Sequence, residues 1–204
     1  MHQKRQAASK MLPIRRKGTK YVAKALHNPK YSVPVVIAVR DMLHLARNAS
    51  EVRKMIVQKA LKINGRIVKD YRDAISLLNL FEADKTYVLT LLPTKKFVLK
   101  ETKDKERVCK VIGKRLLGKN TIQLNLHDGT NFLVKDSSIK VNDSVLLQDN
   151  KFKSHLPLAK GKEVFIFKGK YAGNVGKILE INDVAEIKLK DSSVQLNKIN
   201  IIAI

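Results

Sequence analysis

The sequence predicts a multidomain α+β protein with a basic N-terminal arm, a small unit of two helices and a hairpin, a central β module and a small C-terminal β-barrel. Three observations indicate this arrangement. The first 40 positions hold ten cationic residues and no acidic one, apolar residues recur at helical spacing between residues 32 and 60, and they alternate with polar residues from residue 93 onward. A chain of 204 residues has room for several small domains of this kind.

The charge of the chain is large and unevenly distributed. There are 41 Lys and Arg residues against 18 Asp and Glu, a formal net charge of +23, and ten of the cations precede the first acidic residue, Asp41. A polyphosphate partner would release condensed counterions on binding such a segment. Solubility alone needs a net charge of only about 2 to 8 in a small domain. The charge therefore favours a nucleic-acid partner over a solubilising surface, and an anionic membrane comes third.

Composition also disfavours several other classes of protein. No apolar run approaches the roughly twenty residues of a transmembrane helix, and the first residues lead into no apolar signal core, so we expect neither a membrane partner nor secretion. The one cysteine, Cys109, excludes an internal disulfide and a cysteine-built metal site. The histidines form no pair at metal-ligand spacing on one helix, so we expect no metal and no cofactor; they are His2, His27, His44, His127 and His155.

Residues 1–31 mix Lys and Arg with Ala, Ser, Gly18 and Pro13 and show no sustained period. This composition is typical of an extended basic arm that becomes ordered on its partner. The candidate nucleic-acid-binding residues of the arm are Lys4, Arg5, Lys10, Arg15, Arg16, Lys17 and Lys20.

Residues 32–92 form the second expected unit. A first helix is predicted to begin near Pro34, because proline at the start of a helix loses no intrahelical hydrogen bond. Asn48 with Glu51 three residues later predicts a capping box that opens a second helix. The expected buried stripes are Val39, Met42, Leu43 and Ala46 in the first helix and Val52, Met55, Ile56 and Ala60 in the second.

A tight basic hairpin and one more strand complete this unit. Residues 61–68 alternate around Asn64-Gly65, the strongest short hairpin pattern because both turn positions accept positive φ. A further strand is expected over residues 87–91. Since the apolar stripe of the second helix faces inward, Arg53 and Lys54 are expected on its basic outer face.

Residues 93–155 are expected to form an all-β module, because apolar residues alternate with polar ones along them. The expected strands cover residues 108–112, 122–126 and 132–134, followed by strand, turn and strand over 139–147 and by a polar connector over 150–162.

Residues 156–204 are expected to form a small terminal barrel with strands over 163–167, 178–181, 185–189 and 199–202. Three glycines after the first strand allow a loop that bends sharply and places backbone N–H groups against a surface. Aromatic residues are only 5% of the chain, which favours recognition of folded RNA through phosphates and shape over single-strand stacking. The candidate contacts of the loop are Lys168, Gly169, Lys170, Tyr171, Gly173, Gly176 and Lys177.

No combination of residues predicts an enzyme. Gly113 and Gly118-Lys119 have the spacing of a phosphate-binding loop, but Asn120 stands where a hydroxyl must reach magnesium, and an alternating strand follows instead of a helix. We interpret residues 118–120 as a basic hairpin turn and Cys109 as a buried strand residue. The sequence shows no Ser-His-Asp grouping, and we expect no catalysis and no small-molecule substrate.

The order of these segments resembles the S4e family of small-subunit ribosomal proteins, of the archaeal and eukaryotic type, over nearly the whole chain. His2–Ala8 is similar to the family's basic opening, and residues 109–111 and 139–143 match its central domain. Residues 40–43, 51–54 and 63–66 look like its RNA-binding helix pair and hairpin, which adds Arg40 and Arg66 to the candidate contacts. Lys168–Gly176 looks like the KOW motif of its SH3-like terminal barrel.

The resemblance implies domain limits and a function. It implies a basic arm over 1–31, an S4-like RNA-binding domain over 32–92, a central β domain over 93–155 and a KOW-containing SH3-like barrel over 156–204. The implied function is that of a structural constituent of the small ribosomal subunit, which binds small-subunit rRNA and neighbouring ribosomal proteins. The implied location is the cytoplasmic ribosome, with transit through the nucleolus during assembly if the source is eukaryotic.

Two other functions remain open at this point. The helix-pair module is also appended to pseudouridine synthases, so the chain is alternatively an RNA-modifying enzyme or its targeting subunit, although no segment is left that could hold a catalytic domain. A transcription-elongation factor built on a KOW barrel is the third reading. A uridine-isomerisation assay and co-purification with RNA polymerase would separate these from a ribosomal protein.

Overall fold

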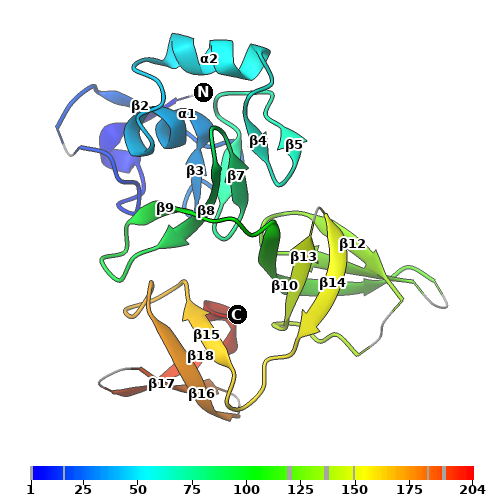
Figure 1. The fold of residues 1–204 in the computed structure, drawn as a ribbon. Coiled ribbons are helices and arrows are strands. Elements are labelled where there is room, and N and C mark those ends of the chain that lie inside the picture. Colours follow the sequence, from blue (N-terminus) through cyan, green and yellow to red (C-terminus); the bar gives the residue numbers. More distant parts are fainter. Residues whose placement is uncertain are drawn as a thin grey trace. The chain divides into compact units, whose positions relative to one another are not determined.

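The computed structural model describes residues 2–15, 17–118, 121–135, 138–148, 150–182, 184–189 and 192–204, and the chain is mostly β-strand (Figure 1). It divides into two compact units, Met1–Lys105 and Glu106–Ile204, which we call the N-terminal unit and the C-terminal unit. In the described ranges, no helix has the length and apolar character needed to cross a bilayer.

The N-terminal unit is built on a five-stranded antiparallel sheet in the order β5-β4-β7-β8-β9. A two-stranded sheet pairs β3 with β6, and a second pairs β1 with β2. The bounds are β1 His2–Lys4, β2 Tyr21–Ala23, β3 Ser32–Pro34, β4 Lys62–Ile63, β5 Arg66–Ile67, β6 Ala74–Ser76, β7 Leu80–Glu82, β8 Thr86–Leu91 and β9 Phe97–Glu101, with a 3₁₀ turn η1 at Arg5–Ala7. The strand expected over 87–91 is confirmed as β8. The sequence did not predict β6, β7 or β9: β6 and β7 have three residues each, and β9 lies in the stretch assigned to the next module.

The first expected helix differs from its prediction. Ser32–Pro34 is strand β3, and the helix that follows consists of α1 (Val35–Ile37) and a π-helical turn η2 (Ala38–Met42). All five side chains from Val35 to Val39 are at most 3% exposed, so this segment is buried on every side rather than along one stripe. Met42 and Leu43 are only half-buried, and Ala46 lies buried beyond the helix.

The second helix and the hairpin are where the local signals placed them. Helix α2 (Ala49–Val57) begins after Asn48, whose Oδ1 accepts a hydrogen bond from the Glu51 amide at 2.9 Å. The Glu51 carboxylate accepts one from the Arg47 amide at 2.7 Å. Asn64 and Gly65 join β4 to β5 with φ values of 52° and 78°, as a type I′ turn requires.

Only part of the predicted stripe of α2 is buried. Val52 is fully buried, Met55 and Ile56 are half-buried, and Ala60 is exposed beyond the end of the helix. The helix therefore contacts the rest of the unit through a narrow face, which leaves much of its circumference open.

Residues 1–31 lie within the N-terminal unit, whereas the sequence predicts an arm that is ordered only on a partner. The β1–β2 pairing sets His2 opposite Ala23. The Leu12 side chain is 2% exposed, and the Phe97 amide donates to the Met11 carbonyl at 2.9 Å. Burial of Leu12 anchors the segment, because removing this side chain from water stabilises it by about 2 kcal/mol.

The C-terminal unit contains a five-stranded antiparallel sheet in the order β12-β11-β10-β13-β14. The long strand β10 (Glu106–Leu116) pairs with β13 in its first half and with β11 in its second, and its register shifts between Val111 and Gly113. The core of this sheet includes Cys109, Leu124 and Ile139. The other bounds are β11 Ile122–Leu126, β12 Asn131–Val134, β13 Ser144–Gln148 and β14 Lys151–Leu156.

Two predictions in this region are wrong. Residues 139–141 form no strand: the Lys140 amide donates to the Asp143 carboxylate at 2.9 Å and the Asn142 amide to the Val111 carbonyl at 3.0 Å, so the segment is a turn that buries Ile139. The expected connector contains strand β14, an edge strand whose lysines gave it the polar composition of a loop. The strands expected at 108–112, 122–126 and 132–134 are confirmed.

A second five-stranded sheet of the C-terminal unit has the order β18-β17-β16-β15-β19. Its core includes Val164, Ile178, Ile187 and Ile201. The sequence correctly predicts β15, β16 and β17, misses β18, and places the last strand two residues early because residues 198–200 form the 3₁₀ turn η3. The bounds are β15 Glu163–Ile166, β16 Val175–Ile181, β17 Val184–Lys188, β18 Ser193–Asn197, η3 Lys198–Asn200 and β19 Ile201–Ala203.

Candidate nucleic-acid interface

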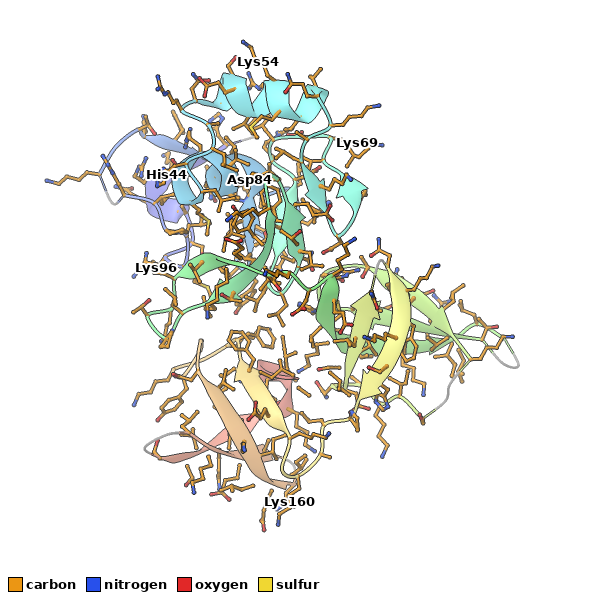
Figure 2. The ribbon with its side chains drawn as sticks, in the orientation of Figure 1. His44, Lys54, Lys69, Asp84, Lys96 and Lys160 are labelled. Atoms are coloured by element: carbon orange, nitrogen blue, oxygen red, sulfur yellow. The ribbon has the colours of Figure 1, made fainter. Side chains whose placement is uncertain are left out.

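Cationic side chains gather on α2 and on the neighbouring hairpin of the N-terminal unit. Arg53 and Lys54 are exposed on α2, and Arg66 is exposed on β5. Figure 2 shows Lys54 on the side of α2 that faces away from the sheet, and Lys69 beyond the hairpin. In the described part of the chain, Arg53, Lys54 and Arg66 take part in no ion pair. Their charge is therefore available to an external anion.

Arg40, the fourth candidate of residues 32–92, is paired internally. Its Nε and Nη2 donate to the two carboxylate oxygens of Asp41 at 2.9 and 2.8 Å. The hydrogen bonds to Asp41 raise the pKa of Arg40, and they outweigh partial burial, which by itself would lower it. Because the pair is nearly neutral as a whole, Arg40 offers an incoming phosphate less attraction than the open arginines do.

Among the candidates in residues 1–31, Arg5 differs from the others. Its guanidinium donates to the carbonyls of Thr19 and Arg15 and to the Thr19 hydroxyl, so it holds Arg15 and Thr19 close to the start of the chain. The other candidates keep their charges exposed, which suits them better than Arg5 to contact phosphates. These are Lys4, Lys10, Arg15, Lys17 and Lys20, whereas Arg16 lies outside the described residues.

The glycine-containing loop connects β15 to β16 and combines tight turns with open cations. Gly169 and Gly173 have φ values of +95° and +94°, where side chains are strained, and the Gly173 amide donates to the Ile166 carbonyl at 2.7 Å. Gly169 and Lys170 are exposed, with the Lys170 ammonium 5.6 Å from the centroid of the Tyr171 ring. Tyr171 packs partly against the core of its sheet.

Three of the predicted loop residues, Lys168, Gly176 and Lys177, lie close to other groups of the C-terminal unit. Lys177 lies on β16 and its Nζ is 3.8 Å from Glu163 Oε1. Lys168 is half-buried with its ammonium 5.3 Å from the centroid of the Phe167 ring. Gly176 is buried on β16, where a Cβ would come within 2.6 Å of Ile187 Cγ2 and 2.7 Å of the Lys188 carbonyl. Because Gly176 has no side chain, β16 and β17 can lie close to each other at this position.

Replacing Gly176 by alanine should destabilise the C-terminal unit by about 1–3 kcal/mol, because the new methyl overlaps a backbone oxygen that cannot swing aside. Urea unfolding of the full chain measures this loss. Gly118→Ala is the matched control, since nothing lies within 4 Å of a Cβ there and its φ is not positive. Equal stability of the two variants would show that Gly176 is not required for the packing.

An aromatic and arginine cluster that the sequence analysis missed lies next to α2. The Cζ atoms of Arg53 and Arg72 are 4.7 and 5.5 Å from the centroid of the Tyr71 ring. Arg72 also forms a bidentate pair with Asp70, and its hydrogen bond lowers the pKa of the Asp70 carboxyl. Sequence spacing could not reveal this cluster, because Arg53 and Tyr71 are 18 positions apart.

A buried lysine joins the two sheets of the C-terminal unit. Lys110 on β10 is 2% exposed, and its Nζ donates to the carbonyls of Lys198 and Ile201 at 2.6 and 2.8 Å. Burial, and next the nearby charge of Lys168, lower the pKa of Lys110 to about 8. The lysine therefore ties η3 and β19 to the central strand β10.

The residues considered for nucleotide binding and for nucleophilic chemistry lie in or between paired strands of the C-terminal unit. Residues 106–116 and 122–126 are paired strands, so the segment around Gly118 joins two strands, with Lys119 and Asn120 outside the described residues. Cys109 is fully buried, and burial, with the Asp128 charge second, raises the pKa of its thiol to about 12. Asp128 in turn pairs with the buried Arg107. Among the described residues no cluster of three or more His, Cys, Asp or Glu side chains could hold a metal ion.

Comparison with known proteins adds a consistent set of similarities. The model of a family described as ribosomal family S4e matches residues 83–153. Small ribosomal subunit protein eS4 of Methanocella arvoryzae is 34% identical over 192 residues, which cover 90% of this chain and 82% of that protein. The eS4 protein of Archaeoglobus fulgidus is 33% identical over 186 residues, which cover 87% of this chain and 79% of that protein.

A solved structure shares the fold. The crystal structure of the 30S ribosomal protein S4e from Thermoplasma acidophilum matches with a TM-score of 0.73 at 22% sequence identity. The match covers 85% of this chain and 95% of that one. The similarity thus extends through both units rather than through one common module.

Proposed function

The chain belongs to the S4e family of ribosomal proteins, and from this membership we propose that it is a structural constituent of the small ribosomal subunit, which binds and organises small-subunit rRNA. The observation that carries the proposal is the identity of 34% with an archaeal eS4 protein along 82% of that protein's length. The mechanism is neutralisation of phosphates by exposed cations held on folded units, together with recognition of RNA shape. No reaction is part of this function.

The proposal includes a division of labour along the chain. Residues 1–31 supply the basic segment, 32–92 an S4-like RNA-binding domain, 93–155 a central β domain and 156–204 an SH3-like barrel with a KOW loop. The type I′ hairpin at Asn64-Gly65 beside α2 supports the second assignment, and the positive φ values of Gly169 and Gly173 support the last. The pairing of β9 with β8 and its inclusion in Met1–Lys105 extend the first folded unit past residue 92.

The proposed RNA contacts follow from the exposed cations. Arg53, Lys54 and Arg66 contact one RNA element, the exposed lysines of residues 1–31 contact a second, and Gly169, Lys170 and Tyr171 a third. Arg5, Arg40 and Gly176 support these surfaces from within, because their groups are engaged by the chain itself. The partners are small-subunit rRNA and neighbouring ribosomal proteins, in a cytoplasmic ribosome, with passage through the nucleolus if the source is eukaryotic.

Sedimentation of the tagged full chain tests this function. On a sucrose gradient at low magnesium, which separates the subunits, the protein should sediment with the small-subunit particle. A tagged protein of similar mass and neutral charge serves as the control for trailing from the top of the gradient. Absence from small-subunit fractions, or co-purification with RNA polymerase instead, would contradict the proposal.

A further inference from the structure

Hydrogen bonds fix the backbone of Tyr71 and of the residues on both sides of it. The Tyr71 carbonyl accepts a hydrogen bond from the Val36 amide at 2.9 Å, and the Arg72 carbonyl accepts one from the Leu26 amide at 3.1 Å. The Asp73 carboxylate accepts hydrogen bonds from the amides of Lys69 and Asp70 at 3.0 and 3.3 Å. The turn that carries Tyr71 is thus fixed to helix α1 and to Leu26.

Two guanidinium groups lie against this ring, and they differ in what else they bind. Arg72 donates from Nε and Nη2 to the carboxylate of Asp70 at 3.2 and 2.8 Å, so its charge is neutralised. Arg53 is exposed, lies 4.7 Å from the ring centroid, and forms no ion pair with any described residue. Arg53 is therefore the arginine of the cluster whose charge no described carboxylate neutralises.

A guanidinium carbon 4.7 Å from a ring centroid is within cation–π range, so contact with the ring restrains the side chain, while N–H groups that do not face the ring can still donate to an oxyanion. A phosphate accepts such a fork through two oxygens. Side chains cannot read bases in the deep, narrow major groove of A-form RNA, so an arginine on an exposed helix meets the backbone of folded RNA first. These points favour a phosphate over a base edge as the ligand of Arg53.

We propose that Tyr71 is a positioning residue that holds the guanidinium of Arg53 for bidentate contact with one phosphate of the bound RNA. The Arg72–Asp70 pair acts as a buttress that fixes the ring without adding net charge. This inference rests on the proposed function, since it names the phosphate site through which that function works on α2.

The test uses the full chain and a small-subunit rRNA transcript, with affinity measured over a range of KCl concentrations. Tyr71→Leu removes the ring and Arg53→Lys keeps the charge but removes the planar fork, so each should weaken binding about threefold to tenfold with an unchanged salt slope. Tyr71→Phe keeps the ring face and should stay within about twofold of the original chain. Arg53→Gln removes a charge and should lower the slope of log affinity against log salt by about 0.7–0.9.

The coupling between the two residues separates positioning from a general structural role. In the Arg53→Lys background, Tyr71→Leu should cause little further loss, because the ring acts through the guanidinium. Arg47→Lys is the matched control, since Arg47 is exposed, in the described ranges lies over no ring, and is not among the proposed RNA contacts; it should bind nearly as well as the original chain.

Several outcomes would overturn the inference. Arg53→Lys binding like the original chain would do so without any change at Tyr71, which keeps the test valid even if Tyr71→Leu unfolds. Losses that multiply in the double variant would show independent action. A loss with Arg53→Gln that depends on transcript sequence but leaves the salt slope unchanged would assign Arg53 to a base. Failure of the original chain to bind the transcript would instead refute the proposed function, and this inference with it.

Discussion

Replacing Lys4, Lys10, Lys17 and Lys20 together by glutamine should make rRNA binding much less dependent on salt. Each lysine that neutralises a phosphate contributes about 0.7–0.9 to the slope of log affinity against log salt, so four lost contacts lower the slope by about 3. Over a tenfold range of salt this is about a thousandfold smaller change in affinity. Filter binding of the full chain to a small-subunit rRNA transcript at several KCl concentrations measures the slope.

The control for this prediction changes the same amount of charge elsewhere. Lys100, Lys103, Lys105 and Lys160 are also exposed, and their joint replacement by glutamine lowers the net charge equally. That variant should keep most of the slope. If both variants lost the same slope, net charge alone would drive binding, and residues 1–31 would have no special place in it.

Substitution is a sharper experiment here than deletion of residues 1–31. Deletion would also remove the buried Leu12 and the Met11 carbonyl that accepts the Phe97 amide. It would further remove the carbonyls of Lys10 and Leu12 that accept from the Lys96 ammonium at 2.6 and 3.4 Å. A loss of affinity after deletion would therefore mix lost charge with unfolding of the N-terminal unit.

Replacing Lys110 by methionine should destabilise the C-terminal unit by about 2–4 kcal/mol at pH 7. The carbonyls of Lys198 and Ile201 would lose their donor, and a buried acceptor without a partner costs about 1–3 kcal/mol. Methionine fills the space of the lysine stem, so the loss reflects the missing hydrogen bonds rather than a cavity. Urea unfolding followed by circular dichroism measures it, with the exposed Lys160→Met as the control.

The difference between the original chain and Lys110→Met should grow as the pH is raised. The pKa of Lys110 is about 8 in the folded chain, against about 10.4 for an exposed lysine, so between these values the unfolded chain binds the extra proton. The free energy of unfolding of the original chain therefore rises over this range relative to the variant, by on the order of 2 kcal/mol. A difference that is constant or shrinks from pH 8 to pH 10 would show that the fold does not lower the pKa of Lys110.

The parts of the fold that could be predicted from sequence are those set by neighbouring residues. The Asn48–Glu51 cap and the Asn64-Gly65 turn depend on contacts within a few positions, and both were found as expected. The turn at 139–141 could not be predicted, because its alternation is that of a strand, while its partner is Val111, next to the register shift of β10. Strand β9 escaped notice because only its pairing with β8 distinguishes it from the module that follows.

In the candidate site, too, the features set by neighbouring residues could be predicted and those set by distant contacts could not. Exposure of Arg53 and Lys54 follows from the apolar face of α2, so the helical period suffices to predict it. The engagement of Arg5 by the carbonyls of residues 15 and 19 requires the loop geometry, which composition does not contain. The Tyr71 cluster and the Lys110 contacts join residues that are 18 and 91 positions apart, beyond any periodic pattern.

The contact between Met11 and Phe97 also has a consequence for how the protein is made. The N-terminal unit closes only when β9 meets a segment 86 positions earlier, and translation proceeds at about 5–20 residues per second. For roughly 4–17 seconds after residue 11 is added, the lysine-rich start of the nascent polypeptide remains without its final packing partner. During this interval Leu12 has no apolar surface to pack against, while the lysines around it are open to polyanions, as they remain in the folded chain.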